Sequence, residues 1–287
     1  MEKKKYRSKK AAERVSLVLI YAVLIIISLV WLIPFLMLII LSFRGENVGM
    51  SADYLFPKEW SFGNYIKLFT ETKFPIWYGN TLLVSVVVTV IQTVIVLMTS
   101  YALSRLRFKM RKPLMNLMLI LGMFPGFLSM TAVYFVLKEI NLTQNLFGLI
   151  LVFTASSAMQ YYICKGFFDT IPKSLDEAAR IDGASRHTVF VKIILPLAKP
   201  IIIYTILTAF IAPWGEYMFS SFIMLGDPDK FTVAVGMKSW LDNSTIASEY
   251  FTVFCAAAVV VSIPITALFI WLQKYYVEGV TGGSVKG

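Results

Sequence analysis

The stretch FPIWYGNTLLVSVVVTVIQTVIVLMTSYALS, from Phe74 to Ser104, contains no charged residue. A helix needs about 20 consecutive apolar residues to cross the hydrocarbon core of a bilayer, and this stretch is longer than that. Lipid offers no hydrogen bonds, so a single apolar segment satisfies its backbone polar groups there only as a helix. The stretch therefore predicts a membrane-spanning α-helix.

Five more uncharged or nearly uncharged runs lie elsewhere in the chain. They are Val15–Phe43, Pro113–Leu137, Ile140–Cys164, Tyr250–Gln273 and a run from about Pro200 to Gly226 that only Glu216 interrupts. The chain is 57% hydrophobic and 15% charged, whereas a soluble domain carries about a quarter charged residues. We therefore expect an all-α membrane protein with six transmembrane helices.

The chain begins with the basic stretch MEKKKYRSKKAAER and then turns apolar, as a signal peptide does. The following run, Val15–Phe43, exceeds the roughly 7–15 residue core of a cleaved signal. We interpret it as a retained first span. The expected organisation is a basic tail (1–14), the first span (15–43), an external segment (44–75), a core of five spans (76–273) and a C-terminal tail (274–287).

Basic residues predict the orientation. Most of the 27 Lys and Arg residues fall in four segments: 1–14, 105–112, 165–199 and 274–287. Cytoplasmic loops carry an excess of Lys and Arg, so these segments and both chain ends are predicted to be cytoplasmic. The net charge of +10 is explained in this way, and no nucleic-acid partner is expected.

The longest cytoplasmic loop, 165–199, has the sequence signals of two short helices. Pro172 suits the first turn of a helix, and Asp176 lies near its N-terminus, where negative charge is favoured. Asp176 and Arg180 are four residues apart and can pair on the helix surface. One face of the predicted helix carries Leu175, Ala178 and Ile181.

A turn and a second helix follow in the same loop. Gly183 can take the left-handed conformation that ends a helix. Ser185 can cap a second short helix that runs through Lys192, with Pro196 closing it. From these residues alone, a hairpin resting on the membrane and a docking element for another protein are equally good interpretations.

The stretch EAARIDGASRHTVFVKIILP, residues 177–196, resembles the EAA loop of permease subunits in ABC importers. In that family the loop forms a coupling helix that sits in a cleft of a cytoplasmic ATPase and passes ATP-driven closure to the spans. The resemblance implies the following coupling residues here: Glu177, Ala178, Ala179, Asp182, Gly183, Ile193, Leu195 and Pro196.

Other stretches are similar to the carbohydrate branch of the same family. They are Asn80-Thr81, SYALSRLRF (100–108), MFPGF (123–127), PWGEYMFSSFIM (213–224), TVAVGM (232–237) and SIPITALF (262–269). The C-terminal GVTGGSVKG resembles the tail of the smaller permease subunit of maltose-type systems, which implies an ATPase contact at Gly282, Gly283 and Lys286. The segment PWGE departs from the maltose subunit and is commoner in the wider branch.

The resemblance implies a permease that pairs with a second permease subunit, an ATPase dimer carrying ATP and Mg²⁺, and an extracellular or periplasmic sugar-binding protein. The expected substrate is maltose, maltodextrin or a similar oligosaccharide, moved by alternating access across the cell membrane of a prokaryote. Two alternatives remain: the same machine importing another solute, such as a different sugar or a sugar phosphate, and an ATP-independent carrier or channel. A carrier would more typically show inverted repeats and several buried charges.

Three residues in the fifth run are candidates for the sugar pathway. Glu216 is the one charge inside a predicted span, and such charges usually face a partner or a wet cavity. Its carboxylate either hydrogen-bonds sugar hydroxyls or pairs with the partner permease. Trp214 and Tyr217 either stack on a sugar ring or serve as ordinary interfacial aromatics.

Motifs for catalysis and metal binding are missing from the sequence. No G-x-x-x-x-G-K-[ST] motif is present to cradle ATP phosphates, and His187 is the single histidine. Cys164 and Cys255 lie in apolar runs without partner spacing, as small packing residues do. We expect no enzymatic activity, metal or cofactor on this chain.

Overall fold

The structure, a computed structural model, describes residues 2–46, 56–123, 126–224, 226–242 and 244–282. Within these residues it is helical, and its β-structure is limited to one isolated antiparallel bridge between Arg44 and Trp60. The helices are α1 (Glu2–Ser42), α2 (Gly63–Thr70), α3 (Phe74–Arg105), α4 (Arg111–Met123), α5 (Gly126–Glu139), α6 (Leu146–Ala155), α7 (Ala158–Thr170), α8 (Lys173–Ile181), α9 (Arg186–Val189), α10 (Leu195–Leu197), α11 (Lys199–Gly215), α12 (Met218–Ile223), α13 (Val233–Ser239) and α14 (Ser244–Gly282). A π-helical segment (Phe190–Ile194) and a 3₁₀ turn (Pro228–Lys230) complete the set.

Three of the predicted spans correspond to single helices. The segments Arg14–Ser42 of α1, Phe74–Arg105 of α3 and Ile246–Tyr275 of α14 are each long and apolar enough to cross a membrane. They match the first, second and sixth apolar runs of the sequence. The segment between the first two, which was predicted to be external, contains the short helix α2.

The third and fourth predicted spans are each a bent pair of helices. The third comprises α4 and α5, at 107° to one another, and the fourth comprises α6 and α7, at 42°. Helix α11 forms the first part of the fifth predicted run, and it meets Arg186–Leu197 of the predicted loop at 81°. The described part of the chain thus holds up to six candidate spans if each bent pair counts as one.

The fourth span also begins later than predicted. Residues 140–145 form a turn in which Asn141 and Gln144 have φ of 56° and 55°. The side chain of Asn145 then caps α6 by accepting a hydrogen bond from the backbone N–H of Phe147 at 2.9 Å. At its other end α7 continues to Thr170, so the loop predicted from residue 165 starts at residue 171.

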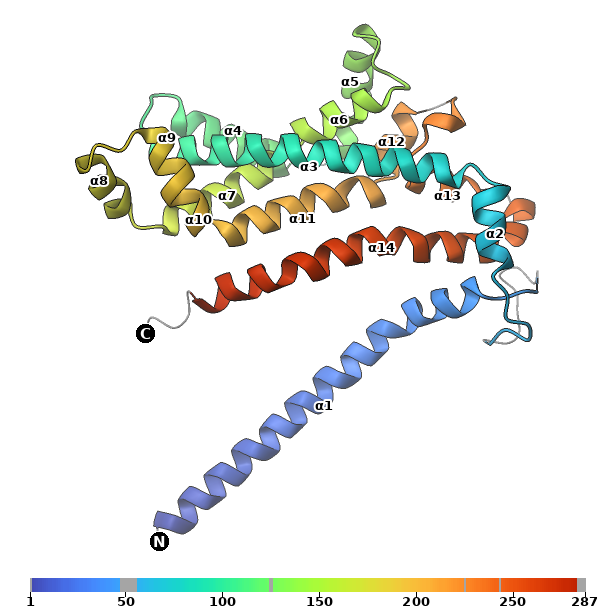
Figure 1. Cartoon of the computed structure of the whole chain (residues 1–287), viewed down its shortest axis with the longest axis horizontal. Helices are drawn as coiled ribbons and strands as arrows, with labels where there is room; N and C mark the ends of the chain where they lie inside the picture. The colour runs from blue at the N-terminus through green and yellow to red at the C-terminus, as the bar shows by residue number, and fades with distance from the viewer. Residues whose placement is uncertain (1, 47–55, 124–125, 225, 243, 283–287) are drawn as a thin grey trace.

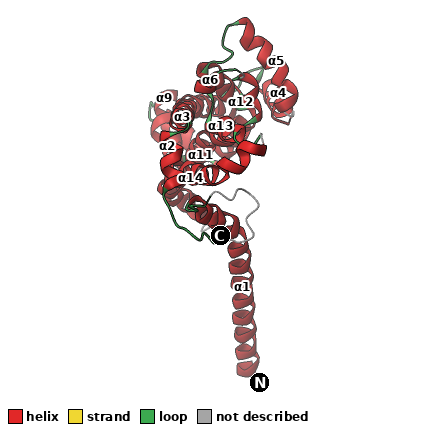
Figure 2. Cartoon of the chain, turned by 90° about the vertical axis from the view of Figure 1, so that its right-hand side faces the viewer, coloured by secondary structure: helices red, strands yellow, loops and turns green. Residues whose placement is uncertain are grey.

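Helices α3, α7 and α11 lie side by side, and α14 packs along α11 (Figure 1). The view from the right-hand end shows these helices bundled together, with α1 extending away from them (Figure 2). No residue in the most apolar part of the α1 span is buried against described residues. The free face of α1 is therefore available to lipid or to another subunit.

The end of α1 is fastened to α2 and α14 through Asn64. Its Nδ2 donates to the carbonyl oxygens of Ser42 and Arg44 at 3.0 and 2.7 Å. Its Oδ1 accepts from the Thr252 hydroxyl at 2.9 Å. One amide on α2 thus joins the two outer helices, because all of its described bonds reach other elements.

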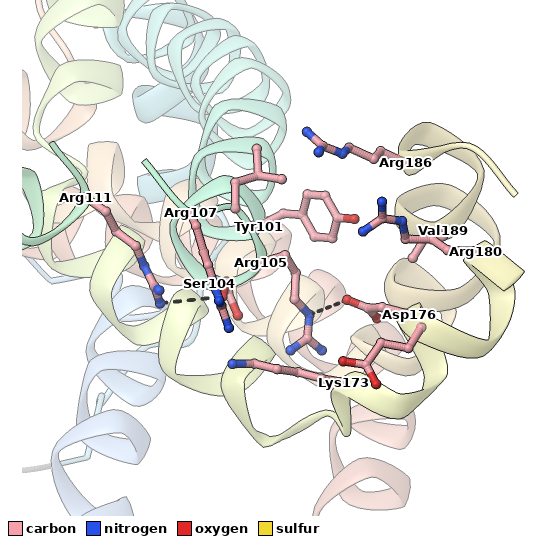
Figure 3. A pocket seen from close by; sticks show the side chains of 12 residues that line it. Tyr101, Ser104, Arg105, Arg107, Arg111, Lys173, Asp176, Arg180, Arg186 and Val189 are labelled. Carbon is pink, nitrogen blue, oxygen red and sulfur yellow. Dashed lines mark hydrogen bonds and ion pairs between the residues drawn. The ribbon is translucent and has the colours of Figure 1, made fainter. Parts of the chain in front are cut away.

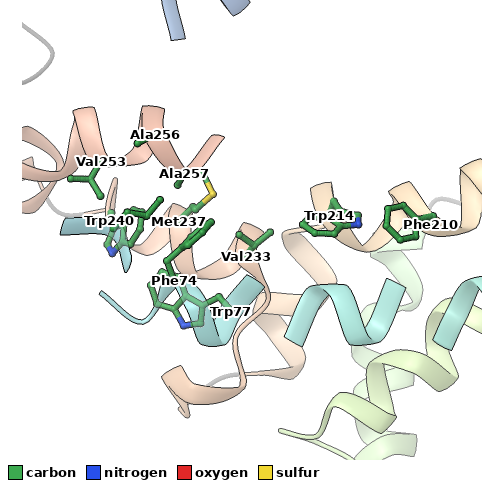
Figure 4. Close-up of a cluster of buried hydrophobic side chains, with 11 residues drawn as sticks. Phe74, Trp77, Phe210, Trp214, Val233, Met237, Trp240, Val253, Ala256 and Ala257 are labelled. Atoms are coloured by element: carbon green, nitrogen blue, oxygen red, sulfur yellow. The ribbon is translucent and has the colours of Figure 1, made fainter. Parts of the chain in front are cut away.

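The main apolar core lies at the opposite end of the bundle from α8 (Figure 1) and joins α2, α3, α11, α13 and α14 (Figure 4). Its buried residues are Leu68, Phe74, Trp77, Phe210, Trp214, Val233, Met237, Trp240, Val253, Ala256 and Ala257. Gly236 lies against the Trp77 ring so closely that a Cβ there would be 2.0 Å from Cε3. The glycine of the TVAVGM stretch is thus required by packing.

The start of α3 is hydrogen-bonded to the segment before α13. The Trp77 indole N–H donates to the carbonyl of Pro228 at 2.8 Å. The Thr81 hydroxyl accepts the backbone N–H of Val233 at 2.8 Å, and Asn80 Nδ2 donates to the carbonyl of Phe231 at 3.0 Å. These bonds give the Asn80-Thr81 pair a structural role at one end of the span.

A polar network connects three spans in the middle of the bundle. Gln92 of α3 donates through Nε2 to the Ser157 hydroxyl at 2.9 Å and to Gln160 Oε1 at 2.7 Å. Gln160 Nε2 in turn donates to the Thr208 hydroxyl of α11 at 3.0 Å. Polar side chains of this kind join helices in lipid, and Ser157 lies where α6 gives way to α7.

Candidate functional site

The hairpin of residues 171–198 lies at the end of the bundle where α3 terminates and α11 begins. Figure 1 shows α8 standing clear of the bundle at that end, with α9 and α10 between it and α3. Helix α8 begins after Pro172, which is its N-cap residue (φ −56°, ψ 129°), so the proline precedes the first turn instead of belonging to it.

Asp176 on α8 pairs with Arg105, the last residue of α3, and this corrects the predicted pairing with Arg180. Asp176 Oδ2 is 3.0 Å from Arg105 Nε, and the two side chains are 15% and 4% exposed (Figure 3). Arg105 Nη2 also donates to the carbonyl of Ile171 at 2.9 Å. Largely removed from water, the two charges attract each other with less screening than a pair on the helix surface.

The predicted glycine turn is confirmed. Gly183 has φ of +85°, and two backbone bonds close the end of α8. The N–H of Gly183 donates to the carbonyl of Arg180 at 3.1 Å, and the N–H of Ala184 donates to that of Ala179 at 2.9 Å. This is a Schellman ending, in which a left-handed residue satisfies the last carbonyls of a helix.

The predicted cap of the second helix is confirmed, but the helix does not end as expected. The Ser185 hydroxyl accepts the N–H of Thr188 at 3.1 Å. The chain then continues through the π-helical segment into α10, so Pro196 lies within helical structure instead of closing it. A widened turn accommodates a residue that has no N–H to donate, which explains why the proline does not stop the helix.

The two helices of the hairpin differ in exposure. Val189 and Ile194 are 2% and 0% exposed and belong to a buried cluster under the hairpin. Leu175 and Ile181 on α8 are 41% and 86% exposed, so its apolar face is uncovered in this chain. The second helix is therefore anchored, whereas α8 presents an apolar surface.

The expected coupling residues lie partly on the exposed helix α8 and its turn, and partly on the anchored second half of the hairpin. Glu177, Ala178, Asp182 and Gly183 are exposed on α8 and its turn, and Pro196 is exposed on α10. Ala179, Ile193 and Leu195 are half-buried. The first group is thus accessible to a partner. Ala179 and Leu195 pack against the buried cluster under the hairpin.

Sequence reasoning missed the residues that hold the hairpin to α3. The ring of Tyr101 packs against that of Phe190 at a tilt of 41°, with centroids 4.6 Å apart. Just before the hairpin, the Ser104 hydroxyl donates to Oδ1 of Asp169 on α7 at 2.6 Å. In the sequence, Arg105 falls in the basic segment 105–112 and in the stretch SYALSRLRF, and neither predicts a partner for it. The sequence did hold a signal for this contact: SYALSRLRF carries positive charges, and the LDEAA stretch (175–179) carries negative ones.

The three candidates for a sugar pathway have different surroundings. Trp214 is 4% exposed and packs in the main core with Phe210 and Tyr78, so its indole faces other side chains of this chain (Figure 4). Glu216 lies after the end of α11 in extended backbone, outside the span in which it was predicted. Tyr217 is 37% exposed.

The Glu216 carboxylate caps α12. Oε1 accepts the N–H of Phe219 at 2.7 Å, and Oε2 accepts the N–H and the hydroxyl of Ser220 at 2.8 Å each. Carboxylates are favoured at helix N-termini, where backbone N–H groups lack partners. Within the described residues, the charge is therefore satisfied locally.

The predicted C-terminal contact falls at the limit of the structure. Gly282 is the last residue of α14, and Gly283 and Lys286 lie outside the described residues. Among the described residues, no group of three His, Cys, Asp or Glu side chains is arranged to hold a metal ion. Cys164 and Cys255 are buried free thiols.

A bundle of apolar candidate spans that carries an ordered two-helix hairpin at one end defines a multi-pass membrane protein of the permease type. The chain belongs to the family of binding-protein-dependent transport system inner membrane components, whose model matches residues 95–282. The matched region contains the end of α3 and the whole hairpin.

Curated relatives align over nearly the entire chain. It is 38% identical to the maltodextrin transport system permease protein MalD of Streptococcus pneumoniae, covering 97% of this chain and 98% of that protein. It is 36% identical to the maltodextrin permease MdxG of Bacillus subtilis, covering 93% and 95%. The galactooligosaccharide permease GanQ of Bacillus subtilis is 34% identical, covering 97% and 98%.

The same fold occurs in a solved structure. A chain of a bacterial ABC transporter involved in the import of the polysaccharide alginate matches with a TM-score of 0.78 at 24% identity. The match covers 92% of this chain and 98% of that one, so the whole fold is shared.

Proposed function

We propose that this chain is one of the two permease subunits of an ATP-driven importer, and that it moves maltodextrin or a similar oligosaccharide across the cell membrane of a prokaryote. The observation that carries the proposal is the exposed face of α8 on a helix tied to the α3 span by the buried Arg105–Asp176 pair. The sugar is supported by the names of two relatives that align over 93% and 97% of this chain.

In this mechanism α8 is the element on which a cytoplasmic ATPase dimer acts. A force on α8 reaches α3 through the Arg105–Asp176 pair and reaches α9 through the Schellman turn at Gly183. Closure of the ATPases draws the hairpin inward and opens the pathway outward, and hydrolysis resets it. The transition is a rigid-body change between two states, because packed helices do not deform continuously.

The partners divide the work. ATP and Mg²⁺ bind to the ATPase subunits, an external binding protein delivers the sugar, and a second permease forms the other half of the pathway. Both chain ends are cytoplasmic, so the tail with Gly282, Gly283 and Lys286 reaches the ATPases. The uncovered face of α1 supports a second membrane subunit, because this span has no buried residues in its most apolar part.

The pathway role falls to Tyr217 more readily than to its neighbours. Tyr217 is 37% exposed, with Lys238 Nζ 5.8 Å from its ring centroid, and its exposed part can contact a sugar. Trp214 packs in the core and Glu216 caps α12. We assign the pathway role to Tyr217 because it is the most exposed of the three side chains.

Transport by the reconstituted complex tests the proposal. Proteoliposomes are supplied with binding protein outside and ATP inside, and uptake of labelled maltotriose and galactotriose is compared. ATP-dependent uptake of maltotriose is expected. Preference for galactotriose would support the second candidate substrate, galactooligosaccharides, which the 34% identical GanQ favours. Uptake that continues without ATP would overturn the importer in favour of a carrier.

A cross-linking experiment tests the coupling surface itself. Ala178→Cys is expected to form a disulfide with a cysteine placed in the ATPase cleft, because Ala178 is exposed on α8. A cysteine at Gly166 on α7, where the neighbourhood is also open, is the control. Equal cross-linking of both positions would remove α8 from the interface.

A further inference from the structure

A pocket of about 380 Å³ lies between the end of α3 and the hairpin (Figure 3). Six cationic side chains line it: Arg105, Arg107, Arg111, Lys173, Arg180 and Arg186. Two carboxylates, Asp176 and Glu177, also line it, so six positive charges against two negative ones leave a surplus of four. The pocket has the size of a small-molecule site, for which about 300–1,000 Å³ is usual.

Arg105 provides the pocket with a buried guanidinium that has an N–H group left unpaired by the described part of the chain. Its side chain is 4% exposed, and its Nη1 has no hydrogen-bond partner among the described residues, although Nη2 and Nε face Ile171 and Asp176. Figure 3 shows the guanidinium in the middle of the pocket, beside Lys173 and Asp176. A buried donor without an acceptor is costly, so this N–H favours an anion that enters the pocket.

Four outer cations of the pocket have no carboxylate partner in the part of the chain that the structure describes. Arg107, Lys173, Arg180 and Arg186 form no ion pair with a described residue. They come from three separate segments, namely the residues after α3, the start and end of α8, and the start of α9. Because these cations come from separate elements, they surround a concave site. A row of charges on one exposed helix would not.

We propose that this pocket binds a phosphate-bearing anion. Planar guanidinium groups donate two parallel hydrogen bonds to phosphate oxygens, and the pocket combines one buried guanidinium with several exposed ones. The anion is either the headgroup of an anionic phospholipid or a soluble phosphorylated compound. A lipid source is compatible with the position of the pocket, at the end of the α3 span where basic pockets contact lipid headgroups.

An anion in this pocket would bridge α3 to α8 and α9, as a second link beside the Arg105–Asp176 pair. If α8 is the coupling helix, occupancy of the pocket stiffens the connection between the motor and the span. That consequence rests on the proposed function, whereas binding of the anion does not.

Two matched variants of the full-length chain test the site. Arg180→Gln with Arg186→Gln removes two exposed pocket cations, and Lys109→Gln with Lys112→Gln removes two exposed cations of the nearby basic segment that do not line the pocket. Both lose the same charge, so diffuse attraction falls equally. Binding is measured in neutral-detergent micelles with pyrophosphate by calorimetry, and by native mass spectrometry with dioleoylphosphatidylglycerol against dioleoylphosphatidylcholine.

The proposal expects wild-type binding that the pocket variant weakens roughly tenfold or more, since each charged hydrogen bond is worth about that factor. The control stays within about twofold of wild type. If the pocket variant loses affinity for pyrophosphate alone, the anion is a soluble phosphate compound. If it loses affinity for phosphatidylglycerol alone, the anion is a lipid headgroup. Should the double pocket variant unfold, Arg186→Gln is compared with Lys109→Gln.

The proposal is overturned if the wild-type chain binds neither pyrophosphate nor dioleoylphosphatidylglycerol. Equal weakening in the pocket and control variants also overturns it, because the attraction is then diffuse. Neither measurement contains an ATPase or a sugar, so failure here leaves the importer proposal untouched, and failure of sugar uptake leaves the anion site untouched.

Discussion

Arg105 at the last turn of α3 and Asp176 in the first half of α8 form a buried ion pair, with 3.0 Å between Nε and Oδ2. The two residues are far apart in the sequence. Their pairing fixes the hairpin to the end of a membrane span, so a displacement of one element is transmitted to the other. Breaking a buried pair by removing one partner leaves an uncompensated charge.

The first prediction concerns this pair. Asp176→Asn is expected to lower sugar uptake strongly and to destabilise the hairpin, by up to about 3–5 kcal/mol if the arginine stays buried. Uptake in proteoliposomes and thermal unfolding in detergent measure the two effects. The reversed double variant, Arg105→Asp with Asp176→Arg, should recover part of the loss. Wild-type uptake in Asp176→Asn would show that the pair does not transmit motion.

The second prediction concerns the turn at Gly183. Gly183→Leu forces a side chain into φ of +85°, which costs roughly 1–2 kcal/mol and disturbs the Schellman ending. We expect uptake to be abolished while membrane insertion and expression are retained. Gly166→Ala is the matched control, because a Cβ at that exposed helical glycine meets no atom within 4 Å. Normal transport in Gly183→Leu would count against the coupling role.

The third prediction tests the packing of α13 on α3. Gly236→Ala would place a Cβ 2.0 Å from Trp77 Cε3 and is expected to destabilise the protein by about 1–3 kcal/mol, as overpacking does. Gly79→Ala, with open space around the new Cβ, should be nearly neutral. Both are compared by thermal unfolding in the same detergent. Equal melting temperatures would contradict the close approach.

The fourth prediction concerns the polar network between three spans. Gln92→Leu removes the bonds to Ser157 and Gln160, and we expect a loss of about 1–2 kcal/mol, the range for interhelical hydrogen bonds in membranes. Thr89→Val is the comparison, because that hydroxyl donates only to the Ser85 carbonyl of its own helix. If both variants melt alike, the network does not hold the spans together.

The fifth prediction separates two roles for Glu216. If its carboxylate serves as the cap of α12, Glu216→Ala should cost about 1 kcal/mol of stability and Glu216→Gln less, since the amide keeps one acceptor oxygen. The apparent affinity for sugar should remain close to wild type in Glu216→Gln. A large change in apparent affinity without a change in melting temperature would instead place Glu216 on the sugar.

The local features of the hairpin were predictable because they depend on neighbouring residues. Gly183 ends α8 and Ser185 caps α9 as expected, since a left-handed turn and an N-cap are decided within a few residues. The predicted partner of Asp176 was wrong for the complementary reason. A residue four positions away is always in reach, but only the folded chain brings Arg105 close enough to compete.

The sequence by itself determined that this chain is a helical membrane protein with a two-helix hairpin, because apolar length and turn chemistry are properties of contiguous residues; the permease assignment of the hairpin came from the resemblance of residues 177–196 to a known family. Only the tertiary structure decided where two of the spans bend and how α11 turns away from the hairpin. It also decided that Trp214 packs in the core, that Glu216 caps α12, and which cations meet around Arg105. These outcomes depend on contacts between distant segments. Each of these side chains pairs with the residue that the folded chain brings next to it, so its partner cannot be predicted from the spacing of neighbouring residues.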